Sequence, residues 1–90
     1  MNPPRYRRHP DLRLTSLEGE GVVLHLKERR YFSVNATGLT LLEALKQPRS
    51  FDELVAEILR EYEVSEDTAA TTTREFLAQC LASAVVEETA

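Results

Sequence analysis

One stretch near the middle of the chain, residues 30–38, constrains the fold more than any other. Its first half, Arg30–Val34, combines two aromatic residues with a serine and a β-branched valine, a mixture typical of a strand. Its second half opens a helix, because Asn35 is a favourable N-cap and leucines follow at positions 39, 42 and 45. The change from a two-residue period to a helical period at Asn35 predicts a sheet that ends where a helical part begins.

A chain of 90 residues predicts one domain with a single small core. No apolar run approaches the roughly 18 residues of a transmembrane helix, and the first residues lack the apolar segment of a signal peptide. The single cysteine, Cys80, excludes an internal disulfide and suits a reducing compartment. We therefore expect a cytoplasmic protein.

The net charge of −4 is unevenly spread. Residues 1–34 carry seven basic and four acidic residues, whereas residues 35–90 carry four basic and eleven acidic ones. Two interpretations stay open: two ordinary solvated surfaces, or a basic sheet that attracts an acidic or mixed-charge partner. Prolines at positions 3, 4 and 10 predict a flexible basic arm over residues 1–11, before a single domain over residues 12–88. Three arginines in this arm are too few to indicate a nucleic-acid contact.

Three strands are expected, over Leu12–Leu17, Val22–Lys27 and Arg30–Val34. Glu18–Gly21 forms the first turn, and a short connection precedes the last strand. In the middle strand, one face takes Val22, Leu24 and Leu26, and the other takes His25 and Lys27. The pattern predicts a three-stranded antiparallel meander whose last strand is an open edge.

Three helices follow the strands. The first covers about residues 36–47 and is stopped by Pro48. The second begins with a capping box, Ser50 with Glu53, and carries the clearest amphipathic pattern of the chain. Ser65 caps the third helix. The tail after Ala84 is either a frayed helix end or a short last strand. The fold class is therefore α+β, a three-stranded antiparallel sheet followed by three helices.

The third helix carries two apolar stripes about 100° apart. We assign the first stripe to the core: Ala69, Thr73, Phe76, Cys80 and Ala84. The second stripe either widens this packing face or lines a groove, and it contains Ala70, Leu77, Leu81 and Val85, with Arg74 among them.

Catalytic and metal-binding patterns are weak in this sequence. A nucleophilic pair would need Cys80 with His9 or His25, and Cys80 lies on the inward stripe, where a buried and inert thiol is usual. One cysteine and two distant histidines lack a recognised metal-ligand spacing, and no glycine-rich phosphate loop is present. We therefore expect a non-enzymatic binding protein without catalytic residues, metal or cofactor.

Two binding modes suit a small sheet followed by three helices. A winged helix would read DNA through a basic helix start, but the third helix opens with Glu66 and Asp67. Alternatively, an extended peptide adds a strand to the open edge Arg30–Val34. The stripe with Leu77 and Leu81 would then supply pockets beside that edge. The second mode fits the residues better.

The order of several motifs resembles the PqqD family of leader-peptide recognition elements. These motifs are the strand Tyr31–Val34, the junction Asn35-x-Thr37-Gly38, the start Ser50-x-x-Glu53 and the helix with Phe76-Leu77 and Leu81. The resemblance covers about residues 12–86. It implies a winged helix-turn-helix-like fold whose third strand and third helix hold the leader segment of a ribosomally synthesised precursor peptide.

The resemblance further implies a stand-alone leader-binding half of a lasso-peptide leader-peptidase system, with a separate cysteine peptidase as partner. The expected role is to present the precursor to that enzyme, without nucleic acid or membrane as partner. The expected peptide-binding residues are Arg30, Tyr31, Phe32, Ser33, Val34, Arg74, Leu77 and Leu81.

Overall fold

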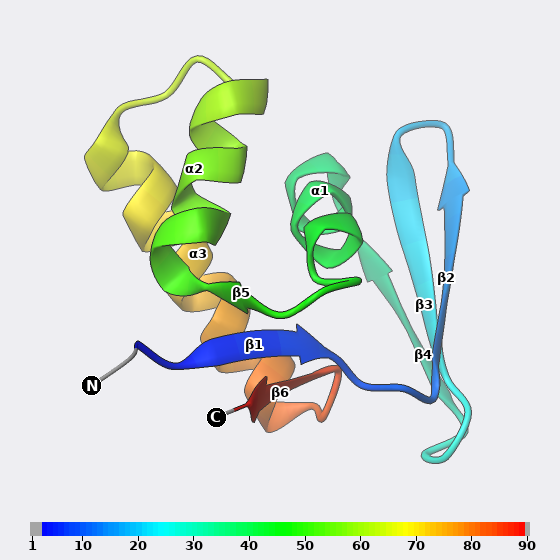
Figure 1. Ribbon diagram of the computed structural model, residues 1–90. Helices are drawn as coiled ribbons and strands as arrows, with labels where there is room; N and C mark the ends of the chain where they lie inside the picture. Colours follow the sequence, from blue (N-terminus) through cyan, green and yellow to red (C-terminus); the bar gives the residue numbers. More distant parts are fainter. Residues whose placement is uncertain (1–2, 90) are drawn as a thin grey trace.

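The computed structural model describes residues 3–89 and contains two small sheets and three helices (Figure 1). The elements, in chain order, are β1 (Arg5–Arg8), β2 (Leu12–Leu17), β3 (Glu20–His25), β4 (Arg30–Val34), α1 (Ala36–Ala44), β5 (Arg49–Ser50), α2 (Phe51–Glu61), α3 (Glu66–Ala82) and β6 (Val86–Thr89). One sheet has the order β2-β3-β4 and the other β5-β1-β6. Helix α1 contacts β3, β4 and α2, and α2 packs on α3. The predicted α+β class, with an antiparallel meander before three helices, is confirmed.

Strand β1 differs from the expected flexible arm over residues 1–11. Arg5–Arg8 pairs with β6 along its length and with β5 at Arg5 and Tyr6. Tyr6 packs against the core, and Arg7 forms an ion pair of 2.7 Å with Glu87 of β6. The tail after Ala84 supplies that partner strand, which resolves the alternative left open by the sequence. The folded unit therefore begins before residue 12.

The β2-β3-β4 sheet has the expected antiparallel order, and β4 has the predicted bounds. The sequence did not say which face of β3 is the inner one, and the structure buries Val23 and His25 while Leu24 and Leu26 are 40% and 44% exposed. Both ring nitrogens of the buried His25 have hydrogen-bond partners. Its Nδ1 accepts from the backbone N–H of Glu28, and its Nε2 lies 3.1 Å from the Ala84 carbonyl oxygen. Apolar residues occupy both faces of β3, so alternation alone could not identify the inner one.

Gly21 shows why the sheet lies in this register. It pairs with Val34 across the strands, and a Cβ at Gly21 would lie 2.7 Å from the Val34 Cγ2 atom. Any larger residue at this position would force the Val34 side chain or its surroundings to shift. The inner face of β3 therefore starts with a glycine, which carries no hydrophobic signal in the sequence.

The helix starts agree with the sequence. Asn35 accepts from the Gly38 N–H at 2.9 Å, Ser65 caps α3, and Ser50 with Glu53 forms the reciprocal capping box. Helix α1 ends at Ala44, three residues earlier than predicted, because the chain turns there toward β5.

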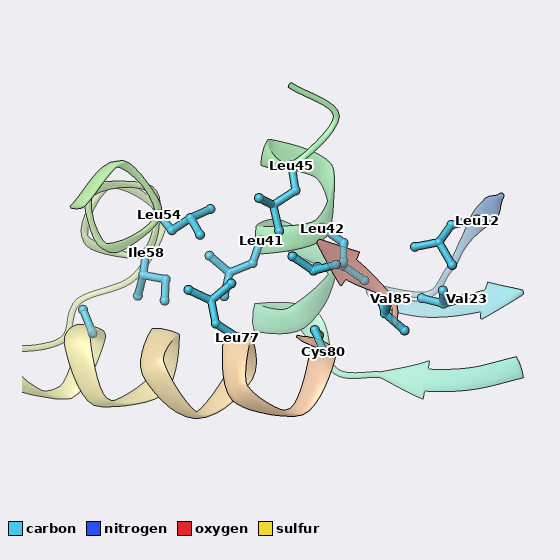
Figure 2. Packing of buried hydrophobic residues seen from close by; sticks show 12 residues of the cluster. Leu12, Val23, Leu41, Leu42, Leu45, Leu54, Ile58, Leu77, Cys80 and Val85 are labelled. Atoms are coloured by element: carbon cyan, nitrogen blue, oxygen red, sulfur yellow. The ribbon is translucent and has the colours of Figure 1, made fainter. Parts of the chain in front are cut away.

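The core lies between the three helices and the inner face of the β2-β3-β4 sheet (Figure 2). Leu41 and Leu42 of α1 and the C-cap residue Leu45 are fully buried, and Leu54 of α2 and Leu77 of α3 meet them. Burial of these leucines is the main source of stability, because apolar area removed from water dominates folding. Within residues 3–89, no helix is both long and apolar enough to cross a bilayer.

Candidate functional site

Strand β4 offers one open edge. It pairs with β3 on one side, and among residues 3–89 no strand pairs with it on the other. An edge strand presents unpaired N–H and C=O groups that can accept a further strand. Strand β4 is five residues long.

A groove of about 530 Å³ lies beside this open edge, between β4 and α3. From β4 and the start of α1, its walls are Phe32, Ser33, Val34, Asn35, Thr37 and Gly38. From α3 and its end, they are Thr72, Glu75, Phe76, Gln79, Cys80 and Ser83. The remaining lining residues are Val23, Leu41 and Val85. The groove thus combines apolar side chains with hydroxyl, amide and carboxylate groups. A peptide strand could pair with β4 and insert side chains toward α3.

Gly38 brings the β4 end, α1 and α3 close together. A Cβ at this position would lie 3.1 Å from Val34 Cβ and 3.4 Å from the Phe76 ring. The Gly38 N–H is also held by the Asn35 side chain. The Asn-x-Thr-Gly junction therefore forms the corner of the groove, where strand and helix meet.

The structure places the predicted β4 residues at three kinds of location. Phe32, Ser33 and Val34 line the groove. Arg30 stacks over the Phe32 ring with its guanidinium carbon 5.2 Å from the ring centroid. Tyr31 points to the outer face of the sheet, does not line the groove and is 76% exposed. Its backbone nevertheless belongs to the edge strand.

The predicted α3 residues lie away from the groove. Leu77 is only 5% exposed and belongs to the core cluster, where Figure 2 shows it directed toward Leu41. Leu81 is 40% exposed but does not line the groove. The guanidinium of Arg74 lies over the Phe51 ring, at the start of α2. The expectation that the Leu77 stripe lines a groove is therefore corrected by the structure.

The sequence analysis assigned the wrong face of α3 to the core. The buried line of α3 runs through Ala69, Thr73, Leu77 and Cys80, so the face beside it, with Phe76, turns toward β4. Sequence reasoning assigned Phe76 to the core and overlooked Gln79. The sequence did contain a sign that Phe76 faces the groove. Phe76 is the only aromatic residue of α3, and it has polar residues three or four positions away on both sides.

Cys80 lies at the boundary between core and groove. Burial raises the pKa of its thiol to about 12, so little thiolate exists near neutral pH. The two histidines contact each other, with ring centroids 4.7 Å apart, and the Nε2 of His25 meets a backbone carbonyl. Within residues 3–89, no three His, Cys, Asp or Glu side chains are placed to share a metal ion.

Comparison with known proteins now adds to this geometry. A family model described as Coenzyme PQQ synthesis protein D (PqqD) matches residues 20–86. A solved structure of TbiB1 in complex with the TbiA(beta) leader peptide aligns with a TM-score of 0.82 and 26% identity, covering 93% of this chain and 98% of that one. A lasso peptide synthetase B1 complexed with the leader peptide aligns with a TM-score of 0.76 and 17% identity, covering 91% and 96%. No curated protein sequence matches this chain.

Proposed function

This chain belongs to the PqqD family, and from its open strand edge we propose that it binds the leader segment of a ribosomally synthesised precursor peptide. The observation that carries the proposal is the position of the groove along β4, where it can receive the side chains of an added strand. The likeness to TbiB1, whose structure contains a leader peptide, supports the same function.

The proposed binding mode is β-strand addition. Backbone groups of Arg30–Val34 would hold the leader without regard to its sequence, and alternate leader side chains would enter the groove. Phe32, Val34 and Phe76 offer apolar contact there, while Glu75 and Gln79 offer polar groups at exposed positions. The leader thus gains affinity from the backbone and specificity from the groove.

The proposed role is presentation rather than chemistry. The neutral, buried Cys80 is a poor nucleophile, so a modification or cleavage of the precursor would fall to another protein. By analogy with the family, we propose a separate cysteine leader peptidase in lasso-peptide biosynthesis as that partner. A DNA-reading role is disfavoured, because exposed Glu66 and Asp67 at the start of α3 would repel phosphates.

Calorimetry with a synthetic leader, taken from a precursor peptide encoded beside this protein, tests the function. We expect a dissociation constant of about 1 μM or tighter, since a short added strand with a few buried side chains can supply ~8 kcal/mol. Phe76→Ala is expected to weaken binding about tenfold or more, whereas the matched substitution Leu81→Ala, on the same helix but outside the groove, leaves it unchanged. Absence of heat at high micromolar concentrations would contradict the proposal.

A further inference from the structure

The outer face of the β2-β3-β4 sheet is apolar and uncovered. Figure 1 shows α1 on one side of this sheet and no described element on the other. Large exposed apolar side chains lie here: Leu17, Leu24 and Tyr31, with exposed fractions of 61%, 40% and 76%, and Leu26, 44% exposed, follows directly after β3. Only two other large apolar residues within residues 3–89 are comparably exposed. Such a patch marks a contact surface more often than chance exposure does.

The register places these residues in rows across the sheet. Arg13, Leu24 and Tyr31 are directly opposite one another, and Leu17 is opposite Glu20 near the hairpin tip. All of them point outward, because the alternate residues of β3, Val23 and His25, point into the core. The two rows are separated by four residues along β2, or roughly 13 Å.

The two ends of this face carry opposite charge. Arg13 lies at one end of this face, next to the turn that carries Lys27, Glu28 and Arg29, and Glu20 lies at the other end, next to the turn that carries Glu18. The ion pairs between side chains of residues 3–89 involve none of these residues. The face is therefore apolar in the middle, basic at one end and acidic at the other.

We propose that this outer face binds a second copy of the chain, with the two sheets face to face and antiparallel. A two-fold axis perpendicular to the strands places the basic end of each sheet over the acidic end of the other. Arg13 then comes within reach of Glu20 of the partner subunit, and the reciprocal pair forms by symmetry. The leucines and Tyr31 are enclosed between these two charge pairs, at the roughly 10 Å spacing of packed sheets.

This interface leaves the groove free. The groove opens at the edge of β4 and toward α3, whereas the proposed contact covers the opposite face of the sheet. Each copy in the dimer can therefore still accept a peptide strand, so self-association and leader binding are separable.

Sedimentation equilibrium of the full chain over about 10–500 μM, in low and high salt, tests the proposal. We expect a monomer–dimer equilibrium that high salt weakens. R13E and E20R, each alone, place like charges at both contacts and should weaken self-association about tenfold or more. An equimolar mixture of R13E and E20R restores both contacts in a heterodimer and should recover the association.

Leu24→Thr keeps a strand-forming residue, removes apolar surface and should weaken the dimer, with an unchanged melting temperature as the control for folding. A monomer at every concentration would overturn the proposal. So would a dimer that R13E and E20R leave intact, or one whose variants show no recovery on mixing, because another face would then form the contact. Leader affinity is measured on the same samples: its loss in all of them, including the unaltered chain, would count against the proposed leader binding and not against the dimer.

Discussion

Strands β1 and β4 begin with the same two residues, Arg and Tyr, yet the fold uses them in opposite ways. Strand β1 has partners on both sides, β5 and β6, so its backbone groups serve the chain itself. Strand β4 has a partner on one side, and across its open edge lies a groove rather than a strand. The comparison teaches that the capacity to accept a peptide depends on tertiary neighbours and not on strand composition.

The largest expected effect concerns the core on which both sheets depend. Leu77→Ala should lower the free energy of unfolding by about 2–5 kcal/mol, because it leaves a cavity against Leu41. Leu81→Ala is the matched control on the same helix and should change the free energy of unfolding by about 0.5 kcal/mol or less. Urea unfolding of both variants provides the measurement. Equal losses would mean that the two leucines do not differ in burial as described.

A proline in β1 should break the doubly paired strand. Tyr6 faces β5 on one side and β6 on the other, so Tyr6→Pro removes a donor whichever way the N–H points. We expect a loss of about 1–3 kcal/mol of stability beyond that of Tyr6→Val, which lacks the same ring but keeps the N–H. Thermal melts of the two variants give the difference. A negligible difference would indicate that β1 contributes little to the fold.

Prolines along β4 should instead give an alternating result. Successive residues of an edge strand direct their N–H groups inward and outward in turn. One of the two sets, positions 31 and 33 or positions 30, 32 and 34, should keep its melting temperature and lose leader affinity about tenfold, the scale of one hydrogen bond. The other set should lose stability. A flat affinity profile among folded variants would argue against strand addition.

The smallest effect is expected at the junction of β5 and α2. Ser50→Ala removes the N-cap and should cost about 1 kcal/mol. The backbone N–H of Ser50, donating to the Glu53 carboxylate, lowers the pKa of Glu53 below 4.5. The stabilisation is therefore present above that pH and is lost as the pH falls through the lowered pKa. Glu53→Gln should flatten the acid limb of stability measured by urea unfolding between neutral pH and about pH 3. An unchanged acid limb would contradict this assignment.

Much of the architecture followed from local chemistry. The caps at Asn35, Ser50 and Ser65 and the bounds of Arg30–Val34 depend on residues close together in the chain, and the structure confirms them. The order of the strands also followed, because short connections join antiparallel neighbours. These features need no knowledge of distant partners.

The face of β3 and the phase of α3 were decided only by tertiary structure. Apolar residues lie on both faces of β3, and two apolar stripes run along α3, so periodicity admits either solution. The choice depended on what fits: Gly21 against Val34, and Leu77 among the leucines of α1. The pairing of β1 likewise required β5 and β6 from distant parts of the chain. The sequence by itself thus determined the three helices, the antiparallel meander and the open edge of β4. Close packing between residues far apart in the chain determined the β5-β1-β6 sheet and which side chains face the groove.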